Sequence, residues 1–195
     1  MDKTKSTKYK IILASGSPRR QQFFKDLDLN YEIRLKEIEE IYPDNLRAEE
    51  ITNYLAELKA SAFEGELLEN EILITSDTLV WLKDKALGKP KDYDDAFEIL
   101  KSLSNETHEV ITSVCFKTTT KSETLFDVTK VTFNTLSEKA IHYYLENYKP
   151  FDKAGAYGIQ EWIGLIGIVK IEGSYTNVVG LPTEKVYKHL TSILV

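Results

Sequence analysis

The chain contains little cysteine, methionine or proline: one cysteine, one methionine and five prolines among 195 residues. A single cysteine can form neither an internal disulfide nor a thiolate metal cluster, which favours a reducing, intracellular environment. Cys115 lies in an apolar run, Val-Cys-Phe, and is predicted to be a buried small hydrophobic residue. No apolar run approaches the roughly 20 residues that a membrane-spanning helix needs. The lysine-rich start, MDKTKSTKYK, precedes no apolar signal core, so we expect a soluble, cytoplasmic protein without membrane contact.

Positive charge and histidine are also scarce. The chain carries 25 lysines and arginines against 31 aspartates and glutamates, a net charge of −6, whereas binding to a nucleic-acid polymer requires a basic face. The three histidines form no cluster in the sequence, which argues against a histidine-bound metal. The sequence contains neither a Ser-His-Asp arrangement nor a glycine-rich phosphate loop. A small anionic ligand, bound by local positive charge, remains compatible with this composition.

Apolar residues, in contrast, make up 42% of the chain, enough for the core of one compact domain over residues 1–195. Their periodicity predicts strands at residues 9–13, 31–35, 71–82, 109–119, 124–136 and 165–171, of which 109–119 and 124–136 form a hairpin. Helices are predicted at 17–27, over a segment with Ile51, Tyr54, Leu55, Leu58 and Ala62 on its apolar face, after the caps Asp92 and Ser137, and from Thr183. This alternation of strands and helices predicts a mixed α/β fold.

The stretch LASGSPRRQQFF, residues 13–24, is typical of a strand that leads into a helix. Ser17 occupies the capping position, and the proline after it suits the first helical turn. Arg19 and Arg20 then follow where the helix dipole and the unpaired N–H groups already favour anions. Surface ion pairs would explain two arginines there, and so would a bound polyanion such as a phosphate, with the Ser15 and Ser17 hydroxyls beside it.

Asp77 directly follows the apolar run ILITS, at what the sequence indicates is the end of a buried strand. An ionised carboxylate buried without a partner is costly, so Asp77 is expected to line a cleft or to bind a cation. The alternative is a structural aspartate that bonds a nearby turn. Ligands of α/β sheets gather at the carboxyl ends of strands, which is where Asp77 and Thr78 are predicted to lie.

Other candidate residues carry weaker signals when each is taken alone. Glu39 and Glu40 form an acidic pair that could bind Mg²⁺, although a solvated acidic loop is the commoner explanation. Lys59 lies at the rim of an apolar helix face, and Lys89 lies in the tight loop LGKPKD. Gln160, in DKAGAYGIQ, could read a base edge with its amide donor and acceptor. For both lysines and the glutamine, an ordinary surface position is the alternative.

The order of these segments is more specific than any one of them. The sequence resembles the Maf family of nucleoside triphosphate pyrophosphatases, and the resemblance covers the chain from Ile11 to about Pro182. The blocks that carry it are, in order, ILASGSPRR, EE, YLAELKA, SDTLV, GKPKDYDDAFEIL, LSNETHEVIT, DKAGAYGIQ and GSYTNVVGLP. Small departures stand at Asn105, Ser113 and Glu161, where family members often have glycine.

The resemblance implies an elongated mixed sheet flanked by helices, with two lobes around a cleft, similar to inosine triphosphate pyrophosphatases. It implies hydrolysis of a nucleoside triphosphate to the monophosphate and pyrophosphate with a divalent metal, Mg²⁺ or Mn²⁺, and it allows a homodimer. Asp77 matches the proton acceptor of the family. Glu40 and Asp77 would bind the metal, so the sequence leaves open whether Asp77 acts as base or as ligand. The residues expected around the substrate are Ser15, Arg19, Arg20, Lys59 and Lys89.

Three positions indicate the branch of the family. Arg19, Thr78 and Gln160 match the specificity residues of the branch that hydrolyses dTTP and UTP, and the branch acting on 7-methyl-GTP has a different block in place of AYGIQ. We therefore expect a dTTP/UTP pyrophosphatase that removes these nucleotides from the pool. The alternatives are a pyrophosphatase for 7-methyl-GTP or modified nucleotides, or a nucleotide-binding regulator of cell division and septum formation.

Overall fold

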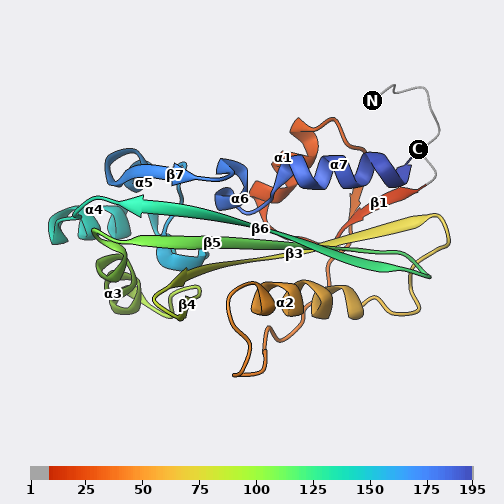
Figure 1. Ribbon diagram of the computed structural model, residues 1–195, viewed down its shortest axis with the longest axis horizontal. Helices are drawn as coiled ribbons and strands as arrows, with labels where there is room; N and C mark the ends of the chain where they lie inside the picture. The colour runs from red at the N-terminus through yellow and green to blue at the C-terminus, as the bar shows by residue number, and fades with distance from the viewer. Residues whose placement is uncertain (1–8, 195) are drawn as a thin grey trace. The chain divides into compact units, whose positions relative to one another are not determined.

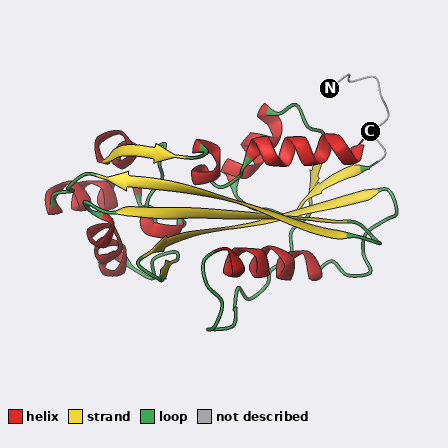
Figure 2. Cartoon of the chain, viewed as in Figure 1, coloured by secondary structure: helices red, strands yellow, loops and turns green. Residues whose placement is uncertain are grey.

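The computed structural model describes residues 9–194 as a mixed sheet with helices packed on it (Figure 1). Within this range the sheet has seven strands, β1 (Lys10–Leu13), β2 (Tyr31–Ile33), β3 (Glu71–Leu82), β4 (Lys85–Leu87), β5 (Thr107–Lys117), β6 (Ser122–Phe133) and β7 (Ile168–Glu172). The helices are α1 (Pro18–Asp26), α2 (Glu49–Ser61), α3 (Tyr93–Leu103), α4 (Glu138–Tyr148), α5 (Trp162–Gly167), α6 (Tyr175–Val179) and α7 (Thr183–Leu194), with a 3-10 turn at Ala154–Ala156 (Figure 2). The predicted α/β class is confirmed.

Neighbouring strands pair in the order β2-β1-β3-β5-β6-β7, with β4 paired to β3. β1 runs parallel to β2 and to the first half of β3, whereas β4 and β7 are antiparallel to β3 and β6. The sheet is therefore mixed, as predicted. The chain divides into two compact units. Among the described residues, the first unit contains 9–77, Thr112–Phe126 and 180–194, and the second contains Thr78–Ile111 and Asp127–Val179.

In the first unit, the apolar runs of β1 and β3 are continuous because both faces of these strands are buried. Successive side chains of a strand point to opposite faces. Ile11 and Leu13 therefore join a core cluster with residues of α1 and α7, while Ile12 joins a second cluster with Ala56 and Ala60 of α2. The helices thus cover both faces of this part of the sheet. Cys115 is fully buried in the α2 cluster, as predicted.

In the second unit, α3, α4 and α5 pack on one core with parts of β3, β5 and β6. The two predicted helix caps are confirmed: Asp92 Oδ1 accepts from the Asp95 N–H at 2.9 Å, and Ser137 Oγ accepts from the Ala140 N–H at 3.2 Å. In the described part of the chain, no helix combines the length and the apolar character needed to cross a membrane.

Some details differ from the sequence predictions. β3 has the predicted bounds, Glu71–Leu82, but Asp77 and Thr78 lie within it and not at its carboxyl end, because β3 pairs with β4 after its parallel pairing with β1 has stopped at Ile74. Residues 165–167, predicted as strand, form the end of α5, and β7 begins at Ile168. Tyr54, predicted on the buried face of α2, is 37% exposed. The face of α2 that packs on the sheet is instead centred on Ala56 and Ala60, and Tyr54 lies to one side of it.

Candidate active site

The turn from β1 into α1 brings two hydroxyl groups to the start of the helix. Pro18 is the first helical residue, as predicted, and Ser17 takes the capping position. The Ser17 side chain makes no capping hydrogen bond, so that prediction is wrong. Instead, the Ser17 N–H donates to Ser15 Oγ at 3.3 Å, and Gln21 Nε2 donates to the Ser15 carbonyl at 3.0 Å. The buried Ser15 is therefore held in place by the first turn of α1.

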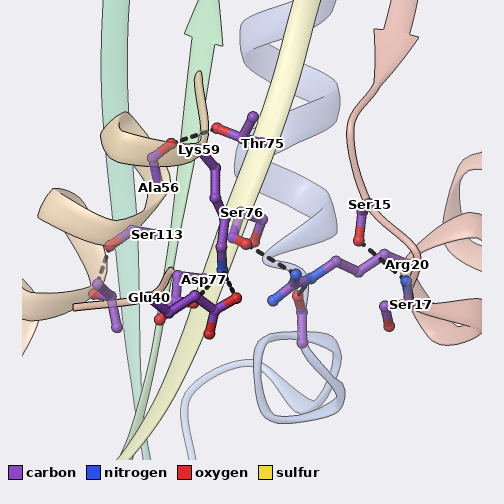
Figure 3. A network of polar contacts seen from close by, with 12 residues as sticks. Ser15, Ser17, Arg20, Glu40, Ala56, Lys59, Thr75, Ser76, Asp77 and Ser113 are labelled. Atoms are coloured by element: carbon purple, nitrogen blue, oxygen red, sulfur yellow. Dashed lines mark hydrogen bonds and ion pairs between the residues drawn. The ribbon is translucent and has the colours of Figure 1, made fainter. Parts of the chain in front are cut away.

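Arg20 reaches from α1 across the first unit to two backbone carbonyls (Figure 3). Its Nε donates to the Gly180 carbonyl at 2.8 Å, and one terminal nitrogen donates to the Ser76 carbonyl at 2.9 Å. Burial of the guanidinium lowers the pKa of Arg20, and the nearby Asp77 carboxylate opposes that shift. An arginine stays protonated in proteins, so Arg20 places a fixed positive charge next to Asp77.

Lys59 bridges two carboxylates in the same unit (Figure 3). Its ammonium group lies 2.6 Å from Asp77 Oδ1 and 2.9 Å from Glu40 Oε1. The side chains of Lys59 and Asp77 are only 17% and 11% exposed, whereas Glu40 is exposed. The structure therefore brings together Lys59, Glu40 and Asp77, three candidate residues from separate sequence segments.

The strand that carries Asp77 is fastened directly to the helix that carries Lys59. Thr75 and Asp77 are two residues apart on β3 and so point to the same face of the sheet, the face covered by α2. Thr75 Oγ1 donates to the Ala56 carbonyl at 2.6 Å, and Lys59 lies three residues after Ala56 on that helix. Because residues three apart on a helix share a face, this bond sets Lys59 opposite Asp77.

A buried hydroxyl cluster gives α2 a second attachment. Thr52 Oγ1 lies 2.6 Å from Ser113 Oγ of β5, and Ser113 Oγ donates to Asn53 Oδ1 at 2.7 Å. Thr52 and Ser113 are fully buried. Ser113 is one of the positions at which the sequence departs from the Maf pattern, and the structure shows that its hydroxyl joins β5 to α2.

Other predicted site residues lie elsewhere. Arg19 is half-buried in the first turn of α1, next to Arg20. Thr78, Lys89 and Gln160 belong to the second unit, where Thr78 lies in β3 and the other two lie in exposed loops. Their predicted roles stay predictions.

Sequence reasoning missed the carbonyl groups of Ser76 and Gly180, which hold Arg20. A backbone acceptor leaves no residue-type signal, so only the structure could identify this arrangement.

Two cationic and two anionic side chains therefore meet in the first unit, with a buried aspartate among them. Opposed charges of this kind can bind phosphate oxygens through the cations and can bind a cation or a water molecule through the carboxylates. These features define the class of the protein: a mixed α/β protein with a charged candidate active site.

Comparison with known proteins identifies its family. The model of the Maf family, described as "Maf-like protein", matches residues 10–193. A dTTP/UTP pyrophosphatase of Flavobacterium johnsoniae is 71% identical over 100% of both chains, and that of Flavobacterium psychrophilum is 75% identical over 93% of both. Among solved structures, the Ham1 protein of Staphylococcus aureus is similar at 14% identity and a TM-score of 0.48, covering 92% of this chain and 99% of its own. The chain belongs to the Maf family.

Proposed function

We propose that this protein hydrolyses dTTP and UTP to the monophosphates and pyrophosphate, and so clears these nucleotides from the cellular pool. The charged site of the first unit supports this proposal, and so do the names of the Flavobacterium relatives. The single observation that carries it is the pair of contacts that the Lys59 ammonium group makes with the Asp77 and Glu40 carboxylates. These contacts lie beside the Arg20 guanidinium.

This arrangement favours hydrolysis over binding alone. A protein that only sensed a triphosphate would bind it best with cations, because carboxylates repel phosphate oxygens. Here a buried aspartate faces the cations. Such a carboxylate is useful to a hydrolase, which has to accept a proton from the attacking water or hold a metal against the phosphates.

In the proposed reaction, Arg20 and Lys59 stabilise the negative charge that develops on the departing pyrophosphate. Asp77 orients the attacking water and accepts its proton. Since Lys59 is bonded to Asp77 in this structure, phosphate oxygens would have to compete with the carboxylates for that ammonium group. Substrate binding then also releases a carboxylate oxygen of Asp77 for the water.

The carboxylate pair fits a divalent cation. In the described part of the chain, no three or more acidic, histidine or cysteine side chains form a metal cluster. Mg²⁺, however, is commonly held by one or two carboxylates together with substrate phosphates, and Glu40 and Asp77 already converge on one positive charge. These two residues would hold the metal, which when bound would make the phosphorus more electrophilic.

We assign the remaining predicted residues as follows. Ser15 and Arg19, at the start of α1, would contact the triphosphate, with Lys89 as a further cation. Arg19, Thr78 and Gln160 would select the pyrimidine nucleotide. We propose a cytoplasmic location, which is supported by the free cysteine Cys115, because a free thiol is typical of a reducing compartment. A homodimer is the proposed assembly, and light scattering on the purified protein tests it.

A panel of triphosphates tests the proposed function. Purified protein is assayed with Mg²⁺ or Mn²⁺ for pyrophosphate release from dTTP, UTP, CTP, the purine triphosphates and 7-methyl-GTP. We expect dTTP and UTP to give the highest kcat/KM. Preferential cleavage of 7-methyl-GTP would place the protein in the other branch. Tight nucleotide binding without release of pyrophosphate would indicate a regulator instead.

A further inference from the structure

The loop that carries Gln160 in the second unit is fastened to its surroundings at several points. Gly155 has a left-handed backbone (φ +70°), and its N–H donates to the Gly88 carbonyl at 3.0 Å. A Cβ atom at Gly155 would lie 2.7 Å from Val80 Cγ2, so the backbone packs directly on β3. Tyr157 Oη lies 2.7 Å from Nε2 of the buried His108. The approach to Gln160 is therefore rigid.

Gln160 itself lies in a tight turn. The Glu161 N–H donates to the Gly158 carbonyl at 3.0 Å, which makes Ile159 and Gln160 the two central residues of a four-residue turn. Ile159 points inward and is 6% exposed, whereas Gln160 is exposed. No residue that the structure describes forms a hydrogen bond with the Gln160 side chain, so its amide donor and acceptor are directed to solvent.

One hydroxyl group holds both ends of this turn. Tyr144 of α4 is fully buried, and its Oη accepts from the Gly158 N–H at 3.0 Å. The same Oη donates to the Glu161 carboxylate. Burial, and then the hydrogen bond to Glu161, raise the pKa of Tyr144, so the phenol remains a donor at physiological pH.

Glu161 has a structural reason to face Tyr144. It precedes the first residue of α5, in the capping position, but its side chain makes no capping hydrogen bond. Its carboxylate folds back over Gly158, where an added Cβ atom would come within 2.7 Å of Glu161 Cδ. There it also pairs with Lys153 at 3.2 Å. The Glu161 carboxylate therefore stabilises the turn through Tyr144 and does not cap α5.

We propose that Tyr144, acting through Glu161 and the Gly158 amide, is a positioning residue that fixes Gln160 for recognition of the pyrimidine base. The inference rests on the proposed function. Uracil and thymine present a carbonyl acceptor where cytosine presents an amino donor. A freely adapting carboxamide could match either pattern by rotation, because it carries both a donor and an acceptor. The anchored turn fixes the position of the Gln160 backbone, and so limits the distance and direction from which its carboxamide can meet the base and adapt to cytosine.

The test removes only the hydroxyl. In Tyr144→Phe the buried ring stays and both hydrogen bonds are lost. We expect the ratio of kcat/KM for UTP over CTP to fall about fivefold, since one well-placed hydrogen bond contributes on the order of 1 kcal/mol. The loss should lie mainly in a higher KM for UTP and dTTP, because the base is distant from the reacting phosphorus.

Tyr148→Phe is the matched control. Tyr148 lies one helical turn further along α4 and stacks on Tyr144 with ring centroids 5.2 Å apart, but its hydroxyl does not bond the turn. Its removal should leave the UTP-to-CTP ratio unchanged. Glu161→Gln, which keeps an acceptor for Tyr144, should retain most of the selectivity, whereas Glu161→Ala should lose it as Tyr144→Phe does.

A double variant separates positioning from a general structural effect. If Tyr144 acts through Gln160, Tyr144→Phe adds no further loss of selectivity once Gln160 is alanine. Additive losses, or an unchanged UTP-to-CTP ratio in a folded Tyr144→Phe protein, would overturn the inference.

Hydrogen exchange gives a readout that does not depend on turnover. The amides of Gly158 and Glu161 should exchange about tenfold faster in Tyr144→Phe and at the wild-type rate in Tyr148→Phe. Exchange that stays at the wild-type rate would overturn the anchoring role. A wild-type protein that cleaves neither UTP nor dTTP would instead overturn the proposed function and, with it, the proposed role of Gln160 in base recognition. Hydrogen exchange would still decide whether Tyr144 holds the turn.

Discussion

The two units hold their proposed functional groups in different ways. In the first unit, Lys59 is paired with Glu40 and Asp77, so the groups proposed for catalysis neutralise one another. In the second unit, the hydrogen bonds go to the backbone and neighbours of Gln160, and its amide is left available. On the proposed function, the groups proposed for catalysis must exchange partners when a polyphosphate binds, whereas the turn that carries the group proposed for recognition is already held in place.

The largest effect is expected from Asp77→Asn, which removes the negative charge of Asp77 from the charged site of the first unit. The amide can still accept from Lys59, so folding should be preserved, but it cannot accept a proton. We expect kcat for dTTP to fall on the order of 10³-fold, measured by pyrophosphate release. The thermal midpoint should change little. Near-normal turnover in this variant would remove Asp77 from the mechanism.

An intermediate effect is expected from acid acting on the second unit. His108 is 1% exposed, and burial lowers its pKa from 6.5 to about 4. The unfolded chain therefore takes up a proton below about pH 6.5 that the folded chain resists until about pH 4, so stability is lost as the pH falls through this window. Between pH 7 and pH 4.5 the loss should be roughly 2 kcal/mol.

Urea unfolding of wild type and His108→Gln at both pH values measures this loss. The glutamine does not titrate, so the variant should lose roughly 2 kcal/mol less than wild type between the two pH values. Since His108 also bonds Tyr157, the substitution acts where the loop of the second unit contacts the core. Parallel acid sensitivity in both proteins would contradict a buried, neutral His108.

The smallest effect is expected from Ser113→Ala, which probes the support behind the charged site. Loss of the buried hydroxyl leaves Thr52 and Asn53 each without one hydrogen-bond partner, at a cost of about 1–2 kcal/mol of unfolding free energy. Because α2 has a second attachment at Thr75, turnover should fall less than about threefold. A loss of turnover comparable to that of Asp77→Asn would show that Ser113 alone sets the position of Lys59.

Much of the fold could be read from apolar periodicity and capping residues. β3 has the predicted bounds, and Asp92 and Ser137 cap the expected helices, because these features are local. The buried face of α2 was predicted less well. Helical spacing does not tell Tyr54 from Ala56, and the burial of Ala56 alone depends on which elements pack on α2. The start of β7 was misjudged for the same reason, because the apolar residues 165–167 fit a helix end or a strand equally.

The residues of the candidate site were also identifiable from sequence, but their partners were not. The sequence by itself determined the residue types: a buried-strand aspartate, two adjacent arginines at a helix start, and a lysine at a helix rim. Only the tertiary structure decided that Lys59 joins Asp77 to Glu40 and that Arg20 is held by two carbonyls. It also decided that Tyr144 forms hydrogen bonds with both ends of the turn that carries Gln160. The periodicity of apolar residues indicates which face of a segment is buried and which is exposed to water. A hydrogen bond or ion pair between distant segments depends instead on how those segments pack, which no local sequence pattern encodes.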